Sequence, residues 1–474
     1  MNILNKRLLL SLVIVCCVVG ATQARRGNKT DYEHQNVENL QQSSEVDSLD
    51  YTANHHSPLR LRECLEVGIS NNYSLQIVRN REAASHADVT KANAGALPTV
   101  NFSADFDLDF ENDWAKVRAT NTTVYNGSSR DQDIDIGLSV AWTLFDGFKI
   151  QAAYERLQEL ETQSVLATRI AIEDYIASVT AEYYNSIHQA NMLRNLKYAV
   201  DLSRERLRIV ESRYHVGSFS RLDYQQAKVD FNVDSANLIK QQEAVFTSKI
   251  TLNKLMASKD VDAPLMIPDT VVELNTKLNY DRLLRSTLES NSEILDAAQE
   301  TSLAKLDYKT VLARKYPYVV MSAGYGFDQY RYNPGTNKYA STLGFNAGIT
   351  VGINIFDGTR RRQRANASME IKNAELEQEN VELGLRSQLS DLWQSYLNNM
   401  SLLSLEKSSL DSARDNYEIA MDRYMLGDLS GIEMREAQKS LLDAEERILQ
   451  ATFDIKLCEI SLMLISGDIT IYLD

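Results

Sequence analysis

The sequence predicts an internally duplicated α+β membrane protein in which each half contributes two long strands and a pair of very long helices. Three observations lead to this fold class. Short motifs recur in the same order at a nearly constant offset, so the chain is written twice. Within each half, apolar and polar residues alternate over as many as about 12 positions, which is the pattern of a strand. After each pair of strands, the apolar period becomes helical.

Composition narrows the possible partners. The 474 residues include 50 Lys and Arg against 65 Asp and Glu, which gives a formal net charge of −15. This acidic balance argues against nucleic acid as a partner, because phosphate binding needs clustered basic residues. None of the 6 prolines falls in 99–263 or 335–474, so long helices and strands can run unbroken there. A mean hydropathy of −0.32 excludes a bundle of membrane-spanning helices.

The first residues have the features of an export signal. Lys6 and Arg7 precede an apolar run over 8–20, and a small-residue cleavage site ends at Ala24. The run is too short to span ~30 Å of hydrocarbon, which takes about 20 residues. Residues 1–24 are therefore predicted to be a secretory signal peptide.

The polar segment after the predicted signal peptide and the cysteines of the chain give two further expectations. Residues 25–57 have almost no apolar periodicity and are predicted to be a flexible leader. Cys16 and Cys17 lie inside the apolar run of the signal peptide, and neither follows the small residue of a lipid-attachment site. Cys64 and Cys458 remain after cleavage; they are either small buried side chains or one bridge between the chain ends.

The duplication is defined by three pairs of motifs. They are Pro98 and Pro317, the Phe-Asp-Gly at Phe145 and Phe356, and the Tyr-x-x-Gly at Tyr214 and Tyr424. The offsets are 219, 211 and 210, so the halves stay in register except between Pro and Phe-Asp-Gly. We expect a first repeat over 58–278 and a second over 279–474.

Each repeat is predicted to contain two long strands. Their expected ranges are 99–114 and 132–146 in the first repeat, and 318–330 and 341–356 in the second. Globular strands are usually ~5–6 residues long, whereas a strand that crosses a bilayer needs ~9–11 residues with one apolar face. The lengths and the alternation therefore predict a transmembrane sheet.

The sheet has an acidic face. Its predicted acidic residues are Asp105, Asp107, Asp109, Asp133 and Asp135, which would line a barrel lumen or, in a soluble sheet, form only the wet face. Four strands cannot close a barrel, and open edges are excluded from hydrocarbon because every backbone polar group must be paired there. The chain must therefore oligomerise, and three copies would give 12 strands. Symmetry alone does not choose three over two or four.

The helical period begins directly after each Phe-Asp-Gly. Apolar residues from Leu196 to Tyr214 follow a heptad spacing, and a helix is predicted over 148–213. Breaks at Gly217 and Gly427 precede return helices, which are expected over 221–258 and 431–465.

This duplicated order of helix, Pro, strand pair, Phe-Asp-Gly, long helix, Tyr-x-x-Gly and return helix resembles the TolC-type outer-membrane efflux protein family over roughly 58–470. The resemblance implies a homotrimer with a 12-stranded outer-membrane β-barrel continued by a long periplasmic α-helical barrel. It also implies location in the outer membrane of a Gram-negative bacterium, in contact with outer-membrane lipid. A periplasmic adaptor protein and an inner-membrane pump would dock beneath it, as the outer membrane factor of a tripartite export system.

The resemblance also implies a gate at the helical turns. The second turn of the family carries a Tyr and two carboxylates three residues apart, which correspond here to Tyr424, Glu433 and Glu436. Asp223 occupies the position of Glu433 in the first repeat. Three copies would place a ring of carboxylates around a narrow axis and favour cations. The alternative is a solvated helix face. The family's arginine after the turn glycine is replaced by Leu429, which puts a latch at that position in doubt.

Two further departures concern the start of the long helices. The family often has a second glycine after Phe-Asp-Gly, where this chain has Phe148 and Thr359. Four arginines follow the second motif, at Arg360, Arg361, Arg362 and Arg364. They either meet phospholipid head groups or form a solvated first turn of the helix.

The predicted function is an exit duct that passes small molecules such as drugs, or secreted proteins. No nucleotide-binding loop, catalytic motif or zinc pattern is found in the sequence, so neither enzymatic activity nor a cofactor or metal site is expected. The alternative is a periplasmic helical scaffold protein without a channel.

Overall fold

The computed structural model describes residues 59–331 and 339–473. The predicted signal peptide and the predicted leader lie outside these residues, as do Cys16 and Cys17. One compact unit contains Leu59–Ala263 and Ile267–Asp474.

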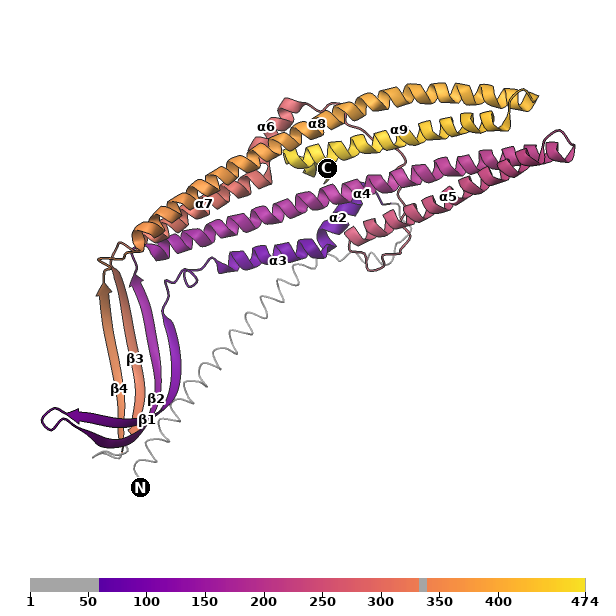
Figure 1. Ribbon diagram of the computed structural model, residues 1–474. Coiled ribbons are helices and arrows are strands. Elements are labelled where there is room, and N and C mark those ends of the chain that lie inside the picture. The colour runs from indigo at the N-terminus through magenta and orange to yellow at the C-terminus, as the bar shows by residue number, and fades with distance from the viewer. Residues whose placement is uncertain (1–58, 332–338, 474) are drawn as a thin grey trace. The chain divides into compact units, whose positions relative to one another are not determined.

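The two repeats have the same element order (Figure 1). The first contains α2 (Leu61–Asn71), α3 (Tyr73–Asp88), β1 (Thr99–Val117), β2 (Thr122–Phe145), α4 (Lys149–His215) and α5 (Arg221–Leu255). The second contains α6 (Tyr280–Ser290), α7 (Ser292–Ala313), β3 (Tyr318–Arg331), β4 (Ala340–Gly352), α8 (Arg360–Leu426) and α9 (Gly431–Ser466), followed by the 3-10 helix η1 (Ile469–Leu473). The core lies where α4 packs against α5, α7 and α9, and where α8 packs against α7 and α9.

The strands form one antiparallel sheet in the order β1-β2-β3-β4 (Figure 1). Residues directly opposite each other lie on the same face of the sheet. One row across the apolar face contains Phe102, Leu138, Tyr325 and Phe345. Phe102 is 67% exposed and Phe345 is 72% exposed, so this apolar face is uncovered in the single chain.

Two strand ends differ from the sequence-based expectation. β2 begins at Thr122 rather than near 132, because β1 continues to Val117 and pairs with Thr122 there. The added segment is polar and does not alternate, so it carried no strand signal. β4 ends at Gly352 rather than near 356, because its partner strand begins at Tyr318, opposite Gly352.

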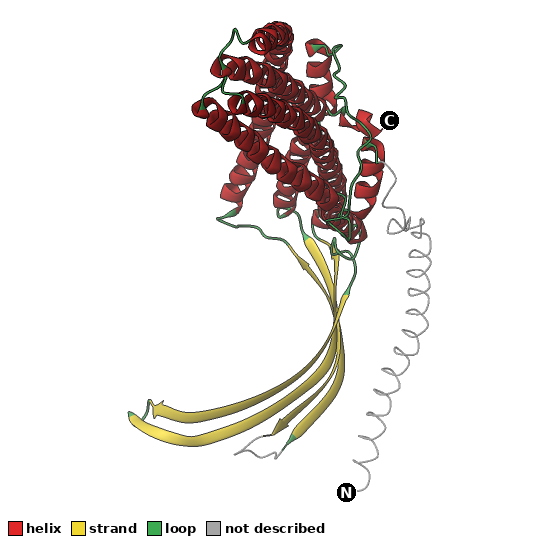
Figure 2. Ribbon diagram, turned by 90° about the vertical axis from the view of Figure 1, so that its right-hand side faces the viewer, coloured by secondary structure: helices red, strands yellow, loops and turns green. Residues whose placement is uncertain are grey.

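Glycines interrupt the polar face of the sheet at one level. Gly137, Gly326 and Gly344 follow Ser103 across the four strands in a single row. A side chain added at Gly137 would meet the backbone of Gly326 at 3.5 Å. Glycine in a strand permits close approach and bending, and the strands curve strongly (Figure 2).

An asparagine closes the base of each helical hairpin. The side-chain oxygen of Asn72 caps α3, and its amide donates to the carbonyl of Leu255 at 3.0 Å. Asn291 caps α7 and donates to the carbonyl of Ile465 at 2.9 Å. Each repeat therefore fastens the end of its return helix to the helix pair that precedes its strands.

The aspartates of the two Phe-Asp-Gly motifs hold the turns that lead into the long helices. Asp146 Oδ1 accepts from the backbone of Ile150 at 3.1 Å, and Asp357 Oδ1 accepts from the backbone of Thr359 at 2.8 Å. Gly147 has a φ of +70°, and a Cβ there would meet the carbonyl oxygen of Ala313 at 2.4 Å. Only glycine fits this turn.

Cys64 and Cys458, the two cysteines among the described residues, are free thiols. Burial raises the pKa of the Cys64 thiol to about 12. The Cys458 sulfur accepts a hydrogen bond from Asn399 at 3.7 Å. Among the described residues, no helix combines the length and the apolar composition needed to cross a bilayer.

Candidate functional site at the tips of the helical hairpins

The turns between α4 and α5 and between α8 and α9 are built in the same way. Gly217 and Gly427 have φ values of +79° and +86°, which ordinary side chains rarely adopt. The backbone of Ser218 donates to the carbonyl of Arg213 at 2.9 Å, closing the end of α4. Asp428 donates to Arg423 at 2.9 Å and closes the end of α8. Both helices therefore end in a glycine-dependent Schellman-type turn.

A reciprocal cap begins each return helix. Ser220 accepts from the backbone of Asp223 at 3.2 Å, and the Asp223 carboxylate accepts from the backbone of Ser220 at 3.0 Å. Ser430 and Glu433 repeat these contacts at 3.2 and 3.1 Å. The hydrogen bonds from Ser430 hold the pKa of Glu433 below its usual range. Two of the predicted gate carboxylates thus have a helix-capping role within their own hairpins.

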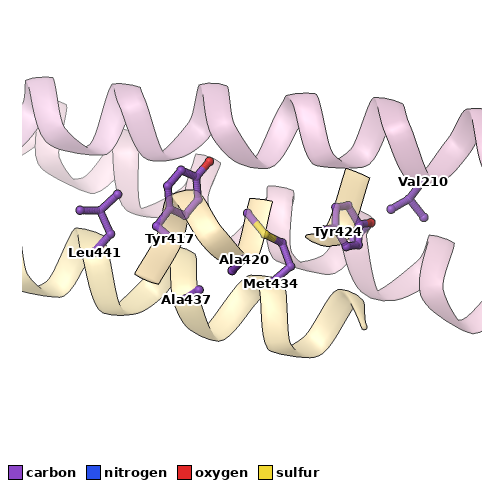
Figure 3. Packing of buried hydrophobic residues seen from close by; sticks show 8 residues of the cluster. Val210, Tyr417, Ala420, Tyr424, Met434, Ala437 and Leu441 are labelled. Atoms are coloured by element: carbon purple, nitrogen blue, oxygen red, sulfur yellow. The ribbon is translucent and has the colours of Figure 1, made fainter. Parts of the chain in front are cut away.

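A shared apolar cluster joins the two tips (Figure 3). Its buried members are Val210, Ala227, Tyr417, Ala420, Tyr424, Met434, Ala437 and Leu441. Tyr424 is only 1% exposed, and its hydroxyl has no hydrogen-bond partner among the described residues. Burial raises the pKa of this hydroxyl. Leu429, which replaces the arginine implied by the resemblance, packs against the same cluster.

Arg213 connects the end of α4 to the end of α8. Its guanidinium donates to the carbonyl oxygens of Tyr424 at 3.2 Å and Met425 at 2.9 Å. It also lies 5.7 Å from the centre of the Tyr424 ring and 5.3 Å from that of Phe219. A cation at the C-terminus of a helix meets unpaired carbonyls and the negative end of the helix dipole. An arginine therefore does join the two tips, but it comes from the first repeat.

Sequence reasoning missed Arg213, although a signal for it was present. Arg213 immediately precedes Tyr214, just as Arg423 precedes Tyr424 in the second repeat. The duplication therefore placed an arginine beside each turn. Which of the two reaches across to the other hairpin could be known only from the packing.

A second ionic contact joins the hairpins further from the turns. Arg435 of α9 donates two hydrogen bonds of 2.7 Å to the carboxylate of Asp234 of α5. Within the first hairpin, Arg206 of α4 pairs with Asp230 of α5.

Two of the predicted gate carboxylates come together in a surface hollow. Glu433 and Glu436 line a hollow of about 330 Å³ with Arg423, beside the apolar cluster. Both glutamates are exposed. Tyr424 and Asp223 do not line this hollow, because the tyrosine is buried and the aspartate caps the other hairpin.

The acidic residues of the sheet form rows across the strands. Asp105 lies opposite Asp135, and Asp135 lies opposite Asp328 of β3. Asp107 lies opposite Asp133, and one row further Asp109 lies opposite Asp131. The five predicted residues therefore share one face. The sequence prediction omitted Asp328 and Asp131, which the register places in the same rows.

Residues 66–258 and 283–468 match the protein family described as outer membrane efflux protein. The two blocks cover most of the chain. The chain belongs to the outer membrane efflux protein family. It is thus an outer membrane efflux channel and not an enzyme, and its location is the outer membrane, as predicted.

Relatives of this outer membrane efflux protein include the probable outer membrane lipoprotein SilC of Salmonella typhimurium. SilC is 21% identical over 396 residues, which are 78% of this chain and 81% of SilC. A membrane protein from Pseudomonas aeruginosa has a TM-score of 0.70 at 17% identity, over 86% of this chain and 90% of that one. The Vibrio cholerae outer membrane protein VceC has a TM-score of 0.66 at 17% identity, over 86% and 96%. These structures share the fold, and the predicted fold class is confirmed.

Proposed function

We propose that three copies of this outer membrane efflux protein close a 12-stranded barrel that forms the exit duct of a tripartite export system. One observation carries the proposal. The sheet has four strands, β1 and β4 are its unpaired edges, and one face is apolar and exposed. An exposed strand edge is not stable in hydrocarbon, so β4 of one copy would pair with β1 of the next.

The other proposed partners follow from this arrangement. The apolar face would contact outer-membrane lipid, and the acidic rows through Asp105 and Asp107 would line the lumen. A periplasmic adaptor protein and an inner-membrane pump would deliver the cargo to the helical end of the channel. The proposed cargo is small molecules such as drugs, with secreted proteins as the alternative.

We further propose that the hairpin tips are the gate. Glu433 and Glu436 would present carboxylates toward a narrow opening, and repetition by three copies would favour cations. Tyr424 would act from within the apolar cluster, because burial of its ring holds the two hairpins together. Asp223 would keep the first turn rigid through its contacts with Ser220.

The test is single-channel conductance in planar bilayers. Glu433→Gln/Glu436→Gln removes both charges, and glutamine at position 433 can still form the cap. Alanine at position 433 would also break the helix cap, so the effect of the lost charge could not be separated from the effect of the lost cap. We expect lower cation selectivity for this variant. Glu379→Gln/Glu446→Gln removes two exposed charges outside the hollow and should behave as the wild type.

The outcomes separate the proposals. Unchanged cation selectivity in the Glu433→Gln/Glu436→Gln variant would contradict the gate assignment and leave the proposed exit duct standing. No conductance from folded oligomers would remove the duct and favour a periplasmic helical scaffold protein.

A further inference from the structure

We propose that a cluster of basic residues, at the edge of the sheet where strands join helices, binds the phosphates of anionic phospholipids. The proposal rests on the proposed function, because it requires the sheet to span the membrane. This junction cluster has six exposed members: Lys149, Arg314, Lys315, Arg361, Arg362 and Arg364.

Strand register brings the cluster to one edge of the sheet. β2 ends at Phe145, which pairs with Val319 near the start of β3, and β4 ends at Gly352, opposite Tyr318. The connections that carry the six residues therefore leave the sheet at the same edge. Direct contacts join these connections. Arg314 donates to Gln363 at 2.6 Å, and the rings of Phe148 and Tyr316 are 5.8 Å apart.

The charge at this edge is strongly unbalanced. The connections 146–149, 314–317 and 353–364 contain Asp146 and Asp357 as their only acidic residues. Both carboxylates already accept hydrogen bonds, Asp146 from Ile150 in the first turn of α4 and Asp357 from Thr359, which directly precedes α8. By contrast, the side chains of Lys149, Arg361 and Arg362 make no hydrogen bond or ion pair within the described chain. Their charges are available to an external anion.

The neighbouring apolar side chains identify that anion as a lipid phosphate. Ile355 and Phe356 are each 86% exposed, and they precede the arginines in the chain. Phe148, next to Lys149, is also exposed. Aromatic side chains favour the boundary between hydrocarbon and head groups, and long basic side chains reach from there to phosphates. Cations beside exposed apolar groups match the head-group layer of a membrane, which offers both phosphates and hydrocarbon. A soluble anion would pair with the cations but would leave the apolar groups exposed to water.

The test uses Trp142 as a reporter in the oligomeric protein reconstituted into vesicles. Trp142 lies at this edge of the sheet, and its indole donates to the carbonyl of Ala96 at 2.9 Å. Trp114→Phe/Trp393→Phe leaves it as the single tryptophan. Quenching by brominated phosphatidylglycerol and by brominated phosphatidylcholine is then compared.

We expect phosphatidylglycerol to associate at least about fivefold more strongly than phosphatidylcholine, because each basic residue near an anionic surface contributes about that factor. Lys149→Gln/Arg361→Gln/Arg362→Gln should lower the ratio strongly, and added salt should lower it in the wild type. The charge-preserving Lys149→Arg/Arg361→Lys/Arg362→Lys variant should keep the preference.

The matched control removes three exposed charges far from the sheet, at Lys197, Lys259 and Lys277. Lys197→Gln/Lys259→Gln/Lys277→Gln should retain the full preference. Equal ratios in the wild type and the junction variant would overturn the proposal. Loss of the preference on adding inorganic phosphate, but not on adding sodium chloride at the same ionic strength, would also overturn it, since the cluster would then bind free phosphate.

Conductance measured on the same vesicles distinguishes this proposal from the proposed function. A junction variant that conducts normally and loses its lipid preference supports both. A junction variant that conducts normally and keeps its preference for phosphatidylglycerol contradicts only the proposed lipid site. A wild-type preference without any conductance removes the duct and keeps the lipid site.

Discussion

Arg435 and Asp234 join the two helical hairpins through a pair of parallel hydrogen bonds, each 2.7 Å long. Their side chains are 22% and 8% exposed, so the contact is largely removed from water. A guanidinium matches a carboxylate in this two-bond geometry, whereas an ammonium does not. Asp234 would remain buried and unpaired if Arg435 were shortened.

We therefore expect Arg435→Lys to loosen the tips. Lysine keeps the charge but cannot form both parallel hydrogen bonds to the largely buried carboxylate, so helix unfolding should occur at a lower temperature and channel conductance should rise. The matched control is Arg447→Lys, which alters the ion pair of Arg447 with Glu406 within the second hairpin. Equal conductance increases in both variants would contradict a specific role for the contact between hairpins.

Arg213→Gln should open the tips without unfolding either hairpin. The variant loses charge-assisted hydrogen bonds to the carbonyls of Tyr424 and Met425, worth about 1–3 kcal/mol. Conductance should increase while the helix content measured by circular dichroism stays unchanged. Arg208→Gln on the same helix removes only an exposed pair with Glu205 and should have no effect. A closed channel in Arg213→Gln would show that the apolar cluster holds the tips alone.

Phe148 has a φ of +73° at the start of α4, a conformation that costs a non-glycine residue roughly 1–3 kcal/mol. Its equivalent, Thr359, has an ordinary φ of −88°. Phe148→Gly should therefore leave the thermal unfolding temperature unchanged or raise it, because relief of strain offsets the lost aromatic contacts. Thr359→Gly should lower it, since glycine there adds freedom to the unfolded chain and removes the hydrogen bond that the Thr359 hydroxyl donates to Asp357. The reverse order would show that the aromatic contacts of Phe148 dominate.

Acidification should destabilise the chain through His188. The imidazole is buried and stacks on Phe453, with ring centres 4.9 Å apart, and burial lowers its pKa from 6.5. A lowered pKa means that the unfolded chain binds the proton more readily, so this contribution to stability is lost as pH falls through about 6.5.

Thermal unfolding at about pH 7.5 and about pH 5.5 checks this expectation in the wild type and in His188→Gln. Burial raises the pKa values of Asp174 and Glu182, and these carboxyls act in the opposite direction at lower pH. The difference between the two proteins therefore isolates the histidine. An identical pH dependence in both would contradict the expectation.

The fold was readable from the sequence because its signals are long and repeated. Strand alternation, the heptad seam and the paired motifs at Phe145 and Phe356 each extend over enough residues to be distinct. The polar start of β2 was missed because nothing alternates between Thr122 and Arg130. Strand pairing with β1 imposes the extended conformation there.

The candidate site was less readable because its contacts cross between repeats. Spacing alone places Glu433 and Glu436 on one helix, and that proximity is found. No local pattern shows that Arg213 reaches Tyr424, or that Arg435 reaches Asp234, because these partners are about 200 residues apart. The capping role of Glu433 could have been noticed, since Ser430 precedes it by three residues.

The matching turns at Gly217 and Gly427 have a mechanical consequence. Each turn closes through its own glycine-dependent helix end and serine cap, and Arg213 adds a contact from the first hairpin to the carbonyls of Tyr424 and Met425. Moving the tips apart would therefore break the contacts of Arg213 and Arg435 and uncover the apolar cluster, but it would leave both turns folded. If the tips are the gate, as proposed, opening would be a rigid-body separation of two intact helical hairpins, and its free energy would depend on the surface between them.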